Sequence, residues 1–220
     1  MLSVRCCFMV LISLSAASAV AGTLQVKVLD QAANGVPETV VYALASGPAP
    51  ASVPSRSDVV IDQIDKEFVH PVTVIRPGTS VIFPNHDKIR HHVYSFSPAK
   101  TFELPLYKDV TPQPIRFDKP GVVALGCNIH DWMSAYIYVV DSAFTALTDG
   151  QGQAVLTLPA GRYELHAWHP RLKNADDNQA RNVTVQAKQD AVVEITVVLK
   201  KSFKSIARIA SGGFDDGAYR

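Results

Sequence analysis

The sequence predicts an all-β protein made of two β-sandwiches. Apolar and polar residues alternate in short runs along most of the chain, as they do in strands that bury one face. Turns that contain glycine and proline separate these runs at fairly regular intervals, which favours a sandwich. No stretch keeps a helical period over a useful length.

The composition limits the classes of function. With 220 residues, 47% of them hydrophobic, the chain has room for one large or two small domains with packed cores. It has 21 Lys and Arg residues against 20 Asp and Glu residues, so its charge gives no indication of binding to nucleic acid or to an anionic membrane.

The first 21 residues are typical of a cleavable signal peptide. Residues 1–5 form a short basic start and residues 6–14 form an apolar run. Residues 15–21 then supply the small side chains that signal peptidase accepts at its cleavage site. The apolar run is too short to span a bilayer comfortably. We therefore expect a periplasmic or secreted protein whose mature chain has no membrane span.

The strands can be placed in order along the chain. Residues 24–28 and 39–44 form two strands, and 47–57 is a linker rich in Pro, Ala and Ser. The expected strands of the next segment, 58–143, are 59–64, 72–75, 80–83, 93–96, 102–107, 110–117, 122–125 and 135–140. Those of the last segment, 144–199, are 154–158, 163–168, 182–186 and 192–199.

The last segment has too few strands to form a sandwich alone, and the first two strands would complete it. We therefore expect an outer domain made of 22–46 and 144–199, with a second domain, 58–143, inserted between its two parts. Residues 200–220 read as a frayed C-terminal tail.

One cysteine remains once the signal peptide is removed, because Cys6 and Cys7 leave with it and only Cys127 stays. Exported proteins normally use cysteine in disulfide pairs. A single remaining cysteine indicates a functional thiol or an intermolecular bridge, and the alternative is a buried, inert residue.

The residues around Cys127 favour a functional thiol. His130 and Met133 follow at spacings of three, at the end of a predicted hairpin, so the three side chains can point at one centre. A second imidazole can come from His91, with the adjacent His92 as the alternative, because only one of two neighbouring strand residues faces inward. One thiolate, two imidazoles and a weak axial thioether are the ligands of a blue copper site, whereas this set suits structural zinc poorly.

The segment 58–143 resembles the cupredoxin (plastocyanin/amicyanin-like) family of blue copper proteins. The resemblance lies in the Cys-x-x-His-x-x-Met loop, in His91-His92-Val93 and in Phe83-Pro84-Asn85. It implies a Greek-key β-sandwich, copper ligands at His91, Cys127, His130 and Met133, and an electron portal at the exposed edge of His130. The chain departs from the family pattern at His92, where the family has asparagine, at Ile129, where proline is frequent, and at the acidic Asp131.

The outer domain resembles carboxypeptidase-regulatory-like (transthyretin-type) β-sandwich modules. The matching pieces are the turns Gly35-Val36-Pro37, 148–152 and 158–163. The chain as a whole is similar to exported bacterial proteins described as methylamine-utilisation proteins.

We therefore predict an exported type 1 copper protein that carries one electron between periplasmic partner proteins. One alternative is a copper storage, delivery or sensing protein without electron transfer. The other is a metal-free binding adaptor on the same scaffold. We expect no enzyme activity, because the chain has no nucleophile elbow and no ligands for a second copper ion.

Overall fold

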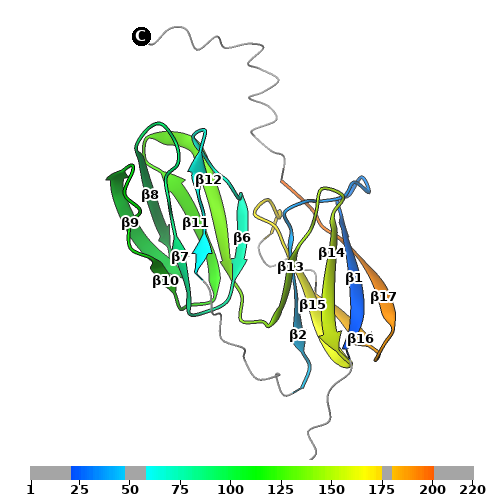
Figure 1. Ribbon diagram of the computed structural model, residues 1–220. Coiled ribbons are helices and arrows are strands. Elements are labelled where there is room, and N and C mark those ends of the chain that lie inside the picture. Colours follow the sequence, from blue (N-terminus) through cyan, green and yellow to red (C-terminus); the bar gives the residue numbers. More distant parts are fainter. Residues whose placement is uncertain (1–20, 48–57, 175–179, 201–220) are drawn as a thin grey trace, which may run out of the picture.

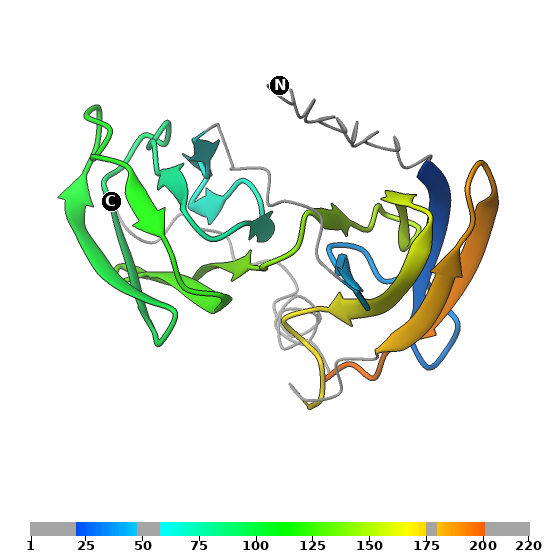
Figure 2. The ribbon, with the colours of Figure 1, turned by 90° about the horizontal axis from the view of Figure 1, so that it is seen from below.

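The computed structural model describes residues 21–47, 58–174 and 180–200. Every regular element in this part of the chain is a strand, so the all-β prediction is confirmed. Figures 1 and 2 show two groups of sheets side by side. Within the described ranges, no helix is long and apolar enough to cross a membrane. Nearly all of the predicted signal peptide, the linker and the C-terminal tail lie outside these ranges.

The first sandwich is built from both ends of the chain. One of its sheets has the order β14 (Gln153–Pro159), β1 (Ala21–Leu29) and β17 (Asp190–Thr196). The other has the order β13 (Phe144–Leu147), β2 (Val40–Ala45), β15 (Gly161–Trp168) and β16 (Arg181–Val185). Leu24, Val26 and Val28 alternate inward from β1 to the shared core, as the period of two requires.

The second sandwich is formed by the middle of the chain. Its large sheet has the order β6 (Val72–Ile75), β12 (His130–Val139), β11 (Gly121–Cys127), β8 (His91–Ser97) and β9 (Lys100–Tyr107). Its small sheet has the order β10 (Ile115–Phe117), β7 (Thr79–Ile82) and β3 (Val59–Val60), and β4 (Gln63–Ile64) pairs with β5 (Glu67–Phe68). Phe83, Phe117 and Ile137 are fully buried in its core. The domain boundaries given above stay predictions.

Aromatic side chains pack between the two sandwiches. The ring of Trp168 on β15 lies 4.8 Å from that of Tyr138 on β12 and 6.1 Å from that of Tyr136, measured between centroids. The hydroxyls of Tyr42 and Tyr138 are 3.3 Å apart. Four successive residues are buried in β2 and again at the end of β15, because one face of each strand covers its own core and the other meets a neighbouring layer.

The structure differs from the expected strands around the hairpin and at short elements. The predicted strand 135–140 begins earlier, at His130, so Met133 lies in strand β12 and not in a loop. The predicted strand 59–64 is split into β3 and β4. The short strands β5 and β13 were not expected, because two to four residues carry too little alternation to be recognised.

Candidate metal centre

The β11–β12 hairpin holds three of the four predicted site residues. Cys127 ends β11, His130 begins β12, and the two residues are paired across the turn. Gly126 pairs with Ser134, so the register shifts at Cys127 and the β12 side of the hairpin has extra residues. In a regular strand, His130 and Met133 would face opposite sides. Because of this irregularity, both are buried.

Strand β8 brings the fourth predicted residue to the same place. Val93 of β8 pairs with Cys127, and His91 lies two residues before Val93 on the inward face. His91 is fully buried. His92 points to the other side of the strand, where its Nε2 lies 3.0 Å from a carboxylate oxygen of Glu103. The structure thus brings His91, and not His92, to Cys127.

The three donor side chains converge on one point inside the protein. A ligand atom from each of His91, Cys127 and His130 can be chosen so that all lie within 4.8 Å of one another. The Sγ atom of Cys127 is 3.7 Å from Nδ1 of His91 and 3.7 Å from Nδ1 of His130. The exposed fractions of the three residues are 0%, 3% and 9%. Met133 is buried in the same hydrophobic cluster as Cys127.

The distal nitrogen of His91 is held by a carboxylate. Nε2 of His91 lies 2.9 Å from Oδ2 of Asp87. Burial alone would raise the pKa of Asp87, but the hydrogen bonds from His91 and from the backbone N–H groups of Lys66 and Lys88 lower it to about 2. Asp87 is therefore ionised at neutral pH and must accept the bond. It follows that Nε2 of His91 donates to Asp87, while Nδ1 faces the Sγ atom of Cys127 at 3.7 Å.

His130 lies at the surface end of the site. Its ring centroid is 5.1 Å from that of Trp132, which is 51% exposed, and Ile129 beside it is also exposed. Burial lowers the pKa of His130, and the neighbouring His91 and Lys66 lower it further, whereas Asp87 opposes them. A neutral imidazole is the form that binds a metal ion.

A buried hydrogen-bond network lies behind the site. Tyr107, which pairs with His91 across β8 and β9, donates its hydroxyl proton to the carbonyl oxygen of Phe83 at 2.8 Å. The side-chain amide of Gln63 donates to the Tyr107 hydroxyl and to the carbonyl oxygen of Pro84. Burial raises the pKa of Tyr107 to about 12, and the nearby Cys127 contributes to the rise, so the phenol stays protonated.

The Tyr107→Phe variant is expected to lose about 1–3 kcal/mol of unfolding free energy, because the Phe83 carbonyl loses a buried donor. Urea denaturation would measure the loss. Tyr94→Phe is the matched control, because the Tyr94 hydroxyl lies at an open groove, and we expect it to change stability by less than about 0.5 kcal/mol. Equal effects of the two substitutions would show that the buried Tyr107 hydroxyl does not stabilise the fold.

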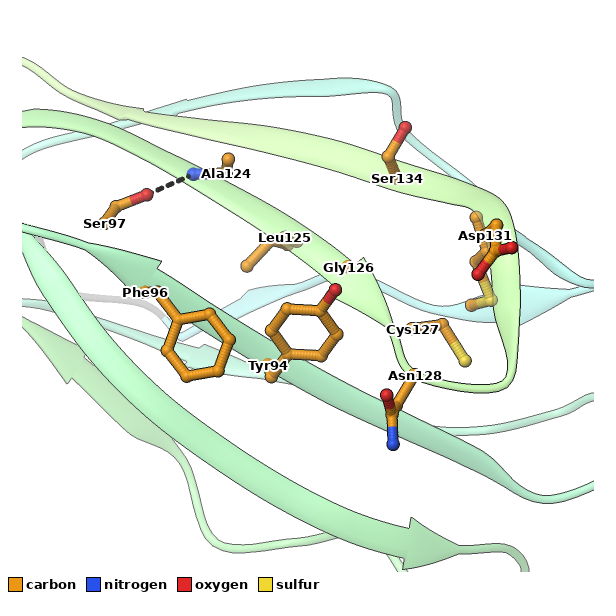
Figure 3. Close-up of a pocket in the computed structure, with 11 residues that line it drawn as sticks. Tyr94, Phe96, Ser97, Ala124, Leu125, Gly126, Cys127, Asn128, Asp131 and Ser134 are labelled. Atoms are coloured by element: carbon orange, nitrogen blue, oxygen red, sulfur yellow. Dashed lines mark hydrogen bonds between the residues drawn. The ribbon is translucent and has the colours of Figure 1, made fainter.

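An open groove of about 440 Å³ runs along the outer face of β8, β11 and β12 to Cys127. Figure 3 shows Tyr94 and Phe96 on one side of this groove and Asn128 near its end. A Cβ atom at Gly126 would come within 2.8 Å of the Tyr94 ring. The absence of a side chain at Gly126 therefore lets the Tyr94 ring lie across β11, one residue before Cys127.

The donor set fits copper. A buried thiolate with two imidazoles is a soft and intermediate combination that suits both oxidation states of copper. Structural zinc sites normally use four Cys or His ligands, and the described residues supply only three at this point. Met133 lies in the same buried cluster as Cys127, where it can add a weak thioether ligand.

Sequence reasoning missed Asp87, Gln63 and Tyr107. Asp87 lies in the loop before β8 and Gln63 in the two-residue strand β4, and a polar residue in such a short piece gives no pattern to interpret. Tyr107 was assigned to a strand, but its inward direction depends on the irregular pairing between His91 and Val93. A histidine at position 91 with an acidic residue four positions earlier would have been the only local signal for Asp87.

Comparisons with known proteins return solved structures alone. No protein-family model and no curated protein matches the chain. A reduced Cu(I) form of an amicyanin mutant is similar to it at 17% identity, with a TM-score of 0.36, and covers 44% of this chain and 98% of its own. An oxidised form of another amicyanin mutant shows 17% identity, a TM-score of 0.35, and coverage of 45% and 99%. Likeness at this level assigns no function, and it does not bear on the resemblances proposed for the first sandwich and for the whole chain.

Proposed function

We propose that the protein binds one copper ion through His91, Cys127 and His130, with Met133 as a weak axial ligand, and that it carries one electron between partner proteins. One observation carries the proposal: a thiol and two imidazole Nδ1 atoms meet in the buried interior, with both sulfur–nitrogen distances at 3.7 Å. Such a ligand set supports rapid exchange between Cu(I) and Cu(II). We place the protein outside the cytoplasm, where its N-terminal segment would direct it.

The electron would enter and leave at the His130 side of the site. His91 is fully buried and its distal nitrogen is occupied by Asp87, so it offers no exposed edge. His130 retains some exposure and packs against the exposed Trp132. A redox partner that docks over Trp132 and Ile129 would therefore come closest to the metal ligands. Large exposed apolar side chains in one patch are a common feature of such contacts.

Titration of the purified mature protein with Cu(II), followed by its visible spectrum, tests the proposal. We expect an intense absorption band that saturates at one copper per chain and that disappears and returns on reduction and reoxidation. His91→Ala is expected to abolish the band. His86→Ala is the matched control, because His86 is an exposed histidine that pairs with Asp62 and is not part of the cluster, and it should leave the band unchanged.

The other outcomes decide between the alternatives. Copper binding without the band or without reversible redox chemistry would overturn electron transfer and favour storage or delivery. No copper binding by the wild-type protein would overturn the proposed function altogether and leave the adaptor.

A further inference from the structure

Asp87 sits in a loop that is built to hold its carboxylate in one position. Oδ2 accepts from Nε2 of His91 at 2.9 Å and from the backbone N–H of Lys66 at 2.6 Å, while Oδ1 accepts from the N–H of Lys88 at 2.6 Å. The Asp87 N–H donates to Oδ1 of Asn85 at 2.9 Å. The carboxylate is only 9% exposed. It therefore cannot turn away from His91 without breaking three hydrogen bonds.

Asn85 fixes the same loop from its other side. Its Nδ2 donates to the carbonyl oxygens of Ile89 and Tyr107, at 3.0 and 2.9 Å. Tyr107 is the residue that pairs with His91 across the sheet. Asn85 thus ties the loop to itself at Ile89 and to β9, the strand next to His91, at Tyr107. The direction of the Asp87 carboxylate relative to the imidazole is set by the backbone.

We propose that Asp87 is a positioning residue that fixes the Nδ1 lone pair of His91 towards Cys127 and shifts the copper site in favour of Cu(II). Only the effect on the oxidation state of copper rests on the proposed function. A carboxylate that accepts a hydrogen bond from a ligand histidine fixes the ring and makes it a stronger donor. The added negative charge, in a poorly solvated place, stabilises the doubly charged ion more than the singly charged one.

The two histidines of the site differ in this respect. His91 is anchored by a buried anion, whereas the neighbour of His130 is the Trp132 ring. We therefore expect His91 to keep its direction when the copper changes its oxidation state. Any adjustment of the site would then fall on His130, at the surface.

A second Asp–His pair provides an internal control. Nδ1 of His86 lies 2.6 Å from Oδ2 of Asp62, so the chemistry of the contact is similar. His86 is exposed and is not part of the metal cluster. Asp62→Asn therefore removes a carboxylate from a histidine of the same protein without touching a proposed ligand.

The first experiment needs no copper. Nitrogen NMR of the imidazole rings in the metal-free wild-type protein at neutral pH is expected to show His91 as a single tautomer with its proton on Nε2. Asp87→Ala removes the acceptor and should give a mixture of tautomers at His91, with that of His86 unchanged. A single Nε2–H tautomer that persists in a folded Asp87→Ala protein would overturn the positioning role.

The second experiment measures the charge effect in the copper-loaded protein. In Asp87→Asn the amide oxygen can still accept from His91 and Lys66, so the tautomer of His91 is kept while the charge is lost, together with the hydrogen bond from the Lys88 N–H. We expect the affinity for Cu(II) to fall about 10–100-fold and that for Cu(I) to fall less. A ten-fold loss confined to Cu(II) corresponds to a rise in reduction potential of about 59 mV for one electron.

Asp62→Asn should leave both copper affinities and the reduction potential unchanged. Asp87→Glu keeps the carboxylate and should therefore lie between Asp87→Asn and the wild-type protein in Cu(II) affinity and in potential. An unchanged potential in Asp87→Asn would overturn the effect on the oxidation state. If the wild-type protein bound no copper, the proposed function would fail, but the tautomer measurement would still decide the positioning role.

Discussion

The Cys127→Ser variant is expected to bind Cu(II) without the intense visible absorption of the wild-type protein, and with an affinity reduced by more than about 100-fold. That loss should exceed the 10–100-fold effect of changing a group that only hydrogen-bonds to a ligand, because a ligand itself is removed. A serine hydroxyl is not ionised at neutral pH, and its hard oxygen replaces the soft sulfur that favours copper. Spectroscopy and competition with a copper chelator would measure both effects.

Met133→Leu is the matched control for this variant. The substitution keeps the volume of a side chain in the same core cluster and should cost less than about 1.5 kcal/mol. Because the thiol and both imidazoles remain, the band should persist, shifted in energy or intensity. A Cys127→Ser protein that kept the band would show that the absorbing copper lies elsewhere. Cys127 is the one cysteine among the described residues, so that result would also exclude a thiolate there.

Much of the site could be predicted from the sequence because it is local. Cys127, His130 and Met133 lie within seven residues, and a hairpin can bring them together whatever the rest of the fold does. The structure buries all three side chains. The register shift at Cys127 could not be predicted, because it depends on how β11 and β12 pair and the spacing of the residues does not reveal it.

The choice between His91 and His92 could not be made from hydrophobic alternation, because β8 reverses the usual rule. Phe96 on this strand is 75% exposed, whereas Ser95 is buried and its hydroxyl accepts from the N–H of Ser97. Reading the aromatic residues as the inward face would have put His92 in the core. The pairing of Val93 with Cys127 is what settles the orientation of the strand.

In the first sandwich, most strand positions could be predicted from the sequence, but the contact with the second sandwich could not. Strands β1 and β14 were predicted at nearly their observed positions because their residues alternate cleanly between buried and exposed. In β2 and β15 the alternation breaks down into runs of buried residues, which indicates that both faces are covered but does not say by what. The partner turned out to be β12, the strand that begins with His130.

Trp168→Ala is expected to lower the free energy of unfolding by about 3–5 kcal/mol, because it empties the space between the two sandwiches. Trp168 is 8% exposed and its ring packs on those of Tyr138 and Tyr136. Denaturation followed by circular dichroism would measure the loss. Trp132→Ala is the matched control, since this exposed tryptophan packs at the rim of the metal site, and its loss should change stability by less than about 1 kcal/mol.

The two tryptophans should also separate stability from function. Trp132→Ala is expected to slow electron exchange with a partner and to leave the free energy of unfolding nearly unchanged. Trp168→Ala should lower the free energy of unfolding and leave electron exchange by the folded protein unchanged. β12 links the two effects, because Ile137 and Val139 face the core behind the metal site while Tyr138 faces the other sandwich. Equal stabilities of the two variants would mean that the contact between the sandwiches contributes little. In that case β12 would be held in place by the core of the second sandwich alone.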